Sequence, residues 1–354
     1  MNHNELNTQT RRRWLQGVGL GSVAAAAANL PSVVGGKTVE QHRLDLRAGN
    51  LRATIVDNHD GLSGKQQIDR RSLMPAAADG HGTLFCTVPF EHRFNGYNGV
   101  ARLHYNEAPS PFLPCAAGQN CEFFFDQQGG SYEPRWSDQP QFVAQQSSLT
   151  SVSDSEAKLR IEQGSRWGVL VESRFELVEP FYLDIEHSFT PSDVGKISGP
   201  VLGVFWASYI QVPKEAAFYF QSADEEWTNI YAALDHGQSG VIAPRSGPVG
   251  NQLAPRKSGR PLLFGVTETQ YGLPFYCGNV NGMLLSFMFQ PSDEVEIRFA
   301  FNPSGGGPGV PAWDYQAVVA DPKPGKRYSF KMRTVYKPFA GLAESLDLYR
   351  RWTG

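Results

Sequence analysis

Short runs in which apolar and polar residues alternate recur from about residue 40 onward, and Gly, Pro, Asn and Asp separate them. In the run WGVLVESRFELV, apolar side chains occupy every second position and charged side chains fall between them. The runs FYLDIEHSF and VEIRFAF repeat the pattern. Because successive side chains of a β-strand point to opposite faces, this alternation predicts antiparallel strands with one buried face each.

Two further runs are apolar on both faces, VLGVFWASYI (201–210) and MLLSFMF (283–289), and they predict central strands. Turn residues recur too often for helices to fit between the strands, which argues against a parallel α/β sheet. The C-terminal GLAESLDLYRRW is the one run with a helical stripe of apolar residues. We therefore predict an all-β fold, a large two-sheet antiparallel sandwich, that forms a single domain over residues 37–354 and includes a C-terminal helix over 340–352.

The N-terminal segment TRRRWLQGVGLGSVAAAAANL has the layout of an export signal. Three Arg precede a Gly- and Ala-rich apolar stretch that is too short to span a bilayer comfortably. The Arg pair followed by Trp-Leu-Gln resembles the twin-arginine type, which carries folded proteins out of the cytoplasm. We expect the signal to occupy residues 1–36, with cleavage between Ala26 and Gly36, and the mature protein to be periplasmic or secreted by the twin-arginine route.

The charge balance argues against two classes of partner. The whole chain has a net charge of -3, and the part beyond residue 36 is near -5 because the signal carries three Arg and one Glu. No block of Lys and Arg is present, so we expect no nucleic acid and no anionic membrane as a partner. Beyond the signal no apolar run is long enough to cross a bilayer, so no stable membrane insertion is expected. The oligomeric state stays open.

Motifs for cofactors and metals are missing from the sequence. It contains no C-x-x-C, no dinucleotide-binding fingerprint, no haem-attachment motif and no H-E-x-x-H. The three glycines of NPSGGGPGVPAWDYQ are followed by prolines rather than by a helix, which argues against a phosphate loop. We therefore expect no cofactor and no metal. Slow folding of a β structure with non-local strand pairing is then the explanation we infer for folded export.

The chain has four cysteines, Cys86, Cys115, Cys121 and Cys277. Cys115 and Cys121 stand six residues apart with a glycine between them, and an oxidising destination would permit a disulfide. Structural or free thiols are the other interpretation, and the sequence leaves the choice open.

Candidate catalytic residues are few. Glu122 lies on an aromatic strand beside Asn120, where apolar surroundings would raise a carboxyl pKa and suit it to general acid catalysis. The alternative is an edge-strand Glu that faces water. His104 ends a strand at a loop and is a candidate base or a plain structural residue, whereas His187 falls on an apolar face and is expected in the core.

The segment GLPFYCGNVNG brings Tyr276 and Asn279 into an apolar neighbourhood, with Arg298 on a nearby strand. A phenol and a guanidinium would suit a polysaccharide lyase, which needs an acid or base and a cation for a developing carboxylate charge. Asp314 lies at the exit of the glycine-rich turn and completes the predicted catalytic set. The predicted substrate-binding residues are Trp206, Tyr209, Trp313, Asn120 and Asn279.

Several stretches, namely GYNGVARL, GVFWASYI, PFYCG, MLLSFMF, SGGGPGVPAWDYQ and GKRYSFKMRTVYKPF, resemble a group of uncharacterised exported bacterial β-sandwich proteins over most of residues 80–352. That resemblance implies no activity. The strand pattern of SRFELVEPFYLDIEHSFTP is loosely similar to the galactose-mutarotase-like fold, which aldose epimerases, lyase domains and periplasmic glucan-handling proteins share. The His and Glu motifs of those enzymes match no segment here, so no residue is carried over.

The function that we predict is an exported carbohydrate-active protein that cleaves glycosidic bonds by acid/base chemistry, as a hydrolase or a lyase. A non-catalytic carbohydrate-binding module and a structural protein are the alternatives. The sugar and the linkage are not predicted, and epimerase activity is not excluded. A catalytic site requires at least three of Glu122, His104, Tyr276, Arg298 and Asp314 to line one cleft, with Trp206, Tyr209 or Trp313 on its wall.

Overall fold

The computed structural model describes residues 42–57, 98–106, 119–126, 129–131, 146–162, 168–208, 210, 215–231, 240–249, 265–303 and 311–354, and the statements below refer to these residues. The predicted export signal, its cleavage region, Cys86, Cys115 and Tyr209 lie outside them. The choice between a Cys115–Cys121 disulfide and structural or free thiols, which the sequence leaves open, is therefore not tested.

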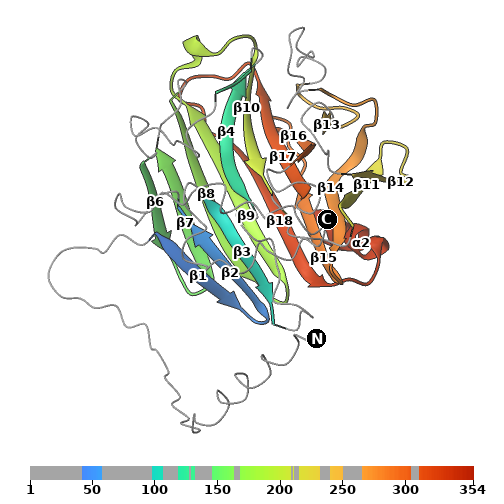
Figure 1. The fold of residues 1–354 in the computed structure, drawn as a ribbon. Helices are drawn as coiled ribbons and strands as arrows, with labels where there is room; N and C mark the ends of the chain where they lie inside the picture. The colour runs from blue at the N-terminus through green and yellow to red at the C-terminus, as the bar shows by residue number, and fades with distance from the viewer. Residues whose placement is uncertain are drawn as a thin grey trace, which may run out of the picture. The chain divides into compact units, whose positions relative to one another are not determined.

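The described strands form three antiparallel sheets, labelled in Figure 1. The largest has nine strands in the order β12 (Trp227–Tyr231), β11 (Ala217–Ser222), β14 (Tyr271–Val280), β15 (Met283–Phe289), β18 (Tyr328–Pro338), β9 (Tyr182–Pro191), β8 (Val169–Val178), β7 (Glu156–Glu162) and β6 (Gln146–Ser151). The second has six strands in the order β13 (Gly240–Ile242), β16 (Glu296–Pro303), β17 (Pro311–Ala320), β10 (Val201–Ala207), β4 (Asn120–Asp126) and β5 (Gly129–Ser131).

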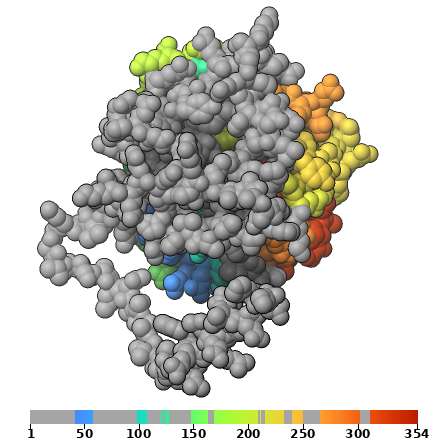
Figure 2. Space-filling model, in the orientation of Figure 1, coloured from blue at the N-terminus to red at the C-terminus, as the bar shows by residue number. Residues whose placement is uncertain are grey.

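A small third sheet consists of β1 (Arg43–Ala48), β2 (Leu51–Val56) and β3 (Gly99–Tyr105). One turn of 3-10 helix, η2 (Val194–Lys196), follows β9, and the chain ends in helix α2 (Leu342–Thr353). The predicted antiparallel β-sandwich with a C-terminal helix is thus confirmed, with the three-stranded sheet as an addition to its two large sheets. Figure 2 shows the β11–β12 hairpin in yellow and α2 in red at the surface.

The sequence pattern explains most of these strands. In β8, buried and partly exposed residues alternate along the whole strand, as the alternation predicts. Strands β10 and β15 are buried at every position, as expected for central strands. The second face of β15 is covered by α2, because Leu284 and Met288 share a buried cluster with Leu348 and Tyr349 of the helix.

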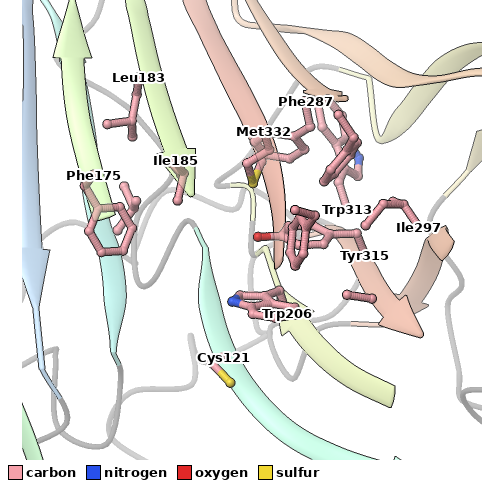
Figure 3. Close-up of a cluster of buried hydrophobic side chains, with 14 of the residues drawn as sticks. Cys121, Phe175, Leu183, Ile185, Trp206, Phe287, Ile297, Trp313, Tyr315 and Met332 are labelled. Atoms are coloured by element: carbon pink, nitrogen blue, oxygen red, sulfur yellow. The ribbon is translucent and has the colours of Figure 1, made fainter. Parts of the chain in front are cut away.

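The six-stranded and nine-stranded sheets pack face to face through large aromatic side chains. Trp206 of β10 stacks on Tyr315 of β17 with 5.5 Å between ring centroids, and Phe330 of β18 meets the Trp206 ring edge-on at 5.2 Å. Figure 3 shows this packing, with Trp206, Trp313 and Tyr315 pointing into the same interior. Each such pair contributes about 0.5–1.5 kcal/mol beyond its buried area.

Buried amides connect all three sheets. Asn98, just before β3, donates from Nδ2 to the Cys121 carbonyl at 2.9 Å and accepts the Cys121 N–H at 3.0 Å. Gln119, just before β4, donates from Nε2 to Thr334 Oγ1 of β18 at 2.6 Å. Because unsatisfied buried amides are destabilising, these bonds fix how the sheets meet. No helix in the described part of the chain is long and apolar enough to cross a membrane.

Candidate functional site

Four polar side chains share the outer face of two neighbouring strands, the face that points away from the nine-stranded sheet. We call Glu296, Arg298, Asp314 and Gln316 the outer-face cluster. In the β16–β17 register, Arg298 is opposite Gln316, and Asp314 is opposite Ala300. The residues that alternate with them along each strand belong to the core between the sheets. These residues are Ile297, Phe299, Trp313 and Tyr315. Alternation along a strand therefore directs all four polar side chains to the opposite face.

These side chains are at most 2% exposed. The prediction that VEIRFAF keeps one face toward solvent is therefore wrong for β16, because its polar face is also covered. Part of the cover is the segment Ala243–Val249, whose Gly247 packs directly against the Glu296 carboxylate. The removal of charged groups from water costs several kcal/mol per ion unless partners compensate, so this face needs internal hydrogen bonds.

An ion pair supplies much of that compensation. Arg298 donates from Nε and from Nη2 to Glu296 Oε1, each at 2.6 Å. The second carboxylate oxygen, Glu296 Oε2, accepts the Val249 N–H at 3.0 Å. Glu296 thus holds the guanidinium in place and also fastens the Ala243–Val249 segment to the sheet.

Asp314 is held separately from that pair. Its Oδ1 accepts the backbone N–H of Ser208, just after β10, at 2.7 Å. Asp314 is a diagonal cross-strand neighbour of Arg298, a relation that places side chains about 7–8 Å apart. A carboxylate, a guanidinium and an amide therefore meet on one small area of the sheet.

Apolar side chains surround the outer-face cluster. A buried hydrophobic group on the same side of the six-stranded sheet contains Phe125, Val201, Phe205, Ala207, Val241, Val249, Ala300 and Val318. Small-molecule sites typically combine a mostly apolar lining with a few polar groups that orient the ligand. The outer face of the six-stranded sheet has that composition.

Arg298 and Asp314 are the two predicted catalytic residues that the described structure brings together. The third member that a catalytic cleft requires would have to be Glu122, whose side chain lies outside the described part, because His104 and Tyr276 lie elsewhere. Tyr276 lies on β14 in the interior and donates its hydroxyl to the Trp313 carbonyl at 3.0 Å, and burial raises its pKa well above the usual value. Trp206 and Trp313 are also interior, with exposed fractions of 1% or less. All three are packing residues between the sheets, so we do not include them in the proposed site.

His104 lies in the three-stranded sheet, opposite Arg52 of β2. Partial burial lowers its pKa, and the positive charges of Arg52 and Arg102 lower it further. Asn279 has a local role, since its Oδ1 accepts the Gly282 N–H at 2.8 Å in the β14–β15 turn. Neither residue belongs to the outer-face cluster.

Glu122 and Asn120 lie on β4, and only their backbone is described. The β4–β10 register shifts between Phe205 and Trp206, so that Glu122 is the extra residue of a β-bulge. Bulges are common beside functional sites, where they redirect a side chain. The catalytic role predicted for Glu122 stays a prediction, as does the binding role of Tyr209.

Sequence reasoning missed Glu296, Gln316 and Ser208 as site residues. Glu296 stands two residues before Arg298, and Gln316 stands two residues after Asp314, so each shares a strand face with a residue that was predicted. This spacing of two is the signal by which the sequence could have identified them. Which strands pair cannot be read from the phase alone, because the phase gives the face on which a side chain lies within its own strand and not the neighbouring strand. In the described ranges, no group of three His, Cys, Asp or Glu residues is suited to a metal ion.

No family model matches the sequence, and no curated protein matches it. Among solved structures, a candidate aldose 1-epimerase from Escherichia coli K12 has 11% identity, with 84% of this chain and 99% of that chain covered and a TM-score of 0.40. An α-N-acetylgalactosaminidase from Bifidobacterium bifidum has 10% identity and a TM-score of 0.41, with 71% of this chain and 35% of that chain covered.

A third structure, an aldose epimerase homologue from C. elegans, has 11% identity and a TM-score of 0.29, with 56% of this chain and 69% of that chain covered. We draw no conclusion about activity from likenesses at these TM-scores.

Proposed function

We propose that this protein is carbohydrate-active, that its site is the outer face of the six-stranded sheet, and that it cleaves glycosidic bonds by acid/base chemistry. The observation that carries the proposal is the outer-face cluster, in which charged and amide side chains meet inside an apolar surrounding. A structural protein could fill the same face with apolar residues at lower desolvation cost. Polar groups kept there at that cost suit a ligand rich in hydroxyl groups.

Asp314 is the residue that we assign to proton transfer. Its carboxylate is oriented by the Ser208 N–H and lies beside an apolar surface, the environment in which a carboxyl group can act as an acid or a base. Gln316 can both donate and accept hydrogen bonds, and a sugar hydroxyl needs both kinds of partner. The Arg298–Glu296 ion pair lies on the neighbouring strand β16 and forms the boundary of the proposed site on that side.

The ion pair favours hydrolysis over elimination. A lyase that acts on uronic acids needs a cation for the substrate carboxylate, but Arg298 is bound to Glu296 through two donors. The three charged groups of the cluster together carry a charge of -1, which would repel an acidic sugar. We therefore propose a neutral glycosidic substrate and a hydrolase.

Access to the cluster requires movement of its cover. Because the four side chains are at most 2% exposed, a ligand can reach them only if the covering chain opens. Segment 243–249 is the described part of that cover. Opening at Gly247 would break the Val249–Glu296 hydrogen bond, whereas Ala243 and Arg245 are hydrogen-bonded to Tyr271 of β14.

The proposal includes export. The arginine motif at residues 11–13 and the apolar stretch after it support delivery to the periplasm or the exterior by the twin-arginine route. The proposed substrate would then be an extracellular or periplasmic glycan.

Incubation of the exported protein with a panel of neutral and acidic polysaccharides, followed by mass spectrometry of the products, tests the proposal. We expect shortened neutral oligosaccharides with the wild type and at least a 100-fold lower rate with Asp314→Asn, a substitution that still accepts the Ser208 N–H. Glu172→Gln on the exposed face of β8 is the matched carboxylate control and should keep full activity.

Binding without products would support the non-catalytic binding module instead. The absence of both binding and products would refute the assignment to carbohydrate. Unsaturated uronate products would show that the protein is a lyase and would contradict the role given to the Arg298–Glu296 pair.

A further inference from the structure

Strand β12 is an edge strand of the nine-stranded sheet, and its two faces differ. In the β11–β12 register, Ile230 is opposite Phe218 and Thr228 is opposite Phe220, and both phenylalanines belong to the core. Alternation therefore places Trp227, Asn229 and Tyr231 on the other face, which points away from the six-stranded sheet. We call these three residues the β12 row.

The β12 row is accessible. Tyr231 is 63% exposed, and within the described ranges only Val152 is also classed as an exposed large hydrophobic residue. Asn229 is exposed and Trp227 is partly exposed. Figure 2 shows the hairpin that carries the row, in yellow, at the surface.

The Trp227 ring is fixed in orientation by its support. Its ring lies edge-on to Phe275 of β14 at 5.9 Å between centroids, in the cluster that also contains α2 residues. A binding ring held by packing loses little side-chain entropy when a ligand arrives.

The surroundings of the row are polar and acidic. Tyr219 of β11, opposite Asn229, donates its hydroxyl to the Glu215 carboxylate, and this bond together with burial raises the Tyr219 pKa to about 12. The β11–β12 turn adds three exposed carboxylates, of which Asp224 is paired with Arg245, while Glu225 and Glu226 add negative charge. An anionic polymer would be repelled by this rim.

We infer that the β12 row is a second carbohydrate site, which binds a neutral polysaccharide chain lying along β12. Aromatic rings stack on the apolar C–H faces of sugars, and an amide between two rings can bond a hydroxyl group. Trp227 and Tyr231 are four residues apart, which is about 14 Å on an extended strand, so the ligand has to be a chain of several sugar units.

The choice of ligand rests on the proposed function, but the site is separate from the outer-face cluster. The cluster is buried on the six-stranded sheet, whereas the β12 row is exposed on the nine-stranded sheet. A surface row of this kind would hold a polymer near the protein while the buried site acts on one bond. The β12 row should therefore increase the rate of hydrolysis for long substrates and have no effect on the rate for short ones.

Affinity electrophoresis of the full chain in native gels that contain hydroxyethyl cellulose, soluble starch, xylan or dextran tests the inference. We expect at least one polymer to retard the wild type. Trp227→Ala and Tyr231→Ala should each weaken the retardation about tenfold, and Tyr231→Phe should keep it because stacking needs the ring and not the hydroxyl. Val152→Ala removes an apolar side chain that is 48% exposed elsewhere on the protein and should change nothing.

Retardation that is unchanged in both alanine variants, or no retardation in any of the four gels, would overturn the inference. The Asp314→Asn variant separates the two sites. Full retardation of Asp314→Asn together with loss in Tyr231→Ala supports the second site even if no hydrolysis is found. Equal loss in both variants would place polymer binding in the outer-face cluster and would overturn the β12 assignment.

Discussion

The charge of His187 should control the stability of this protein in acid. His187 lies between the two large sheets, 2% exposed, with Nδ1 2.7 Å from Ser173 Oγ and Nε2 3.3 Å from the Tyr315 hydroxyl. Trp206 and Phe330 pack on its ring at 4.7 and 5.2 Å between centroids. Burial lowers the His187 pKa from 6.5 to about 3.

The magnitude follows from proton linkage. Between pH 3 and 6.5 the unfolded chain binds a proton at this histidine and the folded chain does not, so stability falls as the pH falls. One pKa unit corresponds to about 1.4 kcal/mol. Between pH 7 and pH 4.5, His187 should therefore remove about 2.5 kcal/mol of unfolding free energy.

Urea unfolding of the wild type and of His187→Gln at pH 7 and pH 4.5 measures this term. Glutamine stays neutral and can donate and accept hydrogen bonds, so the variant keeps partners for Ser173 and Tyr315 but loses the titration. We expect the wild type to lose about 2.5 kcal/mol more than the variant between the two pH values. Other acidic groups titrate in both proteins and cancel in the comparison.

His104→Gln is the control, because His104 is only partly buried and should contribute a smaller acid loss. The reasoning is refuted if the wild type and His187→Gln lose the same unfolding free energy. It is also refuted if the control shows the larger effect.

Three further predictions address packing, a turn and export. Gly203→Ala should reduce the unfolding free energy by about 1–3 kcal/mol in urea, because the added Cβ would overlap the Phe125 ring, and an unchanged midpoint would contradict this. Asn281→Ala should cost about 1 kcal/mol in the same assay, since Asn281 adopts φ 55°, whereas equal stability would show that the turn tolerates alanine. Replacement of Arg12 and Arg13 by Lys should retain the protein in the cytoplasm, as cell fractionation would show, and normal export would argue against the twin-arginine route.

The sequence predicts the strands well because hydrophobic alternation is a local property. Buried and more exposed positions alternate along β8 as apolar and polar residues alternate in its sequence. The apolar strands β10 and β15 are buried on both faces. The helix α2 follows from its apolar stripe in the same way, and its observed bounds, Leu342–Thr353, match the predicted 340–352 closely. The position of His187 in the core also follows, since it stands at an apolar position of its strand.

The candidate site was harder to predict because it depends on which strands become neighbours. Trp206 stands on a strand that is apolar on both sides, and only the pairing shows that its ring faces the interior. Trp313 alternates with Asp314 along β17, so the phase of that run already sets its ring apart from the polar face. Tyr276 similarly bonds a backbone carbonyl of β17, far away in sequence. Arg298 and Asp314 were chosen separately, and their placement on one face follows from the β16–β17 register, which no local pattern encodes.

The place of β18 in the nine-stranded sheet has a consequence for biosynthesis. Among the described strands β18 comes last in sequence, yet it lies between β15 and β9 and hydrogen-bonds to both. While the ribosome is still making residues before 328, β9 and β15 therefore lack the neighbour that joins their two halves of the sheet. Both would present open edges that invite wrong pairing, so chaperones should hold the nascent chain until β18 has been made. Export before folding would move that exposed interval to the far side of the membrane, whereas the proposed twin-arginine route would confine it to the cytoplasm.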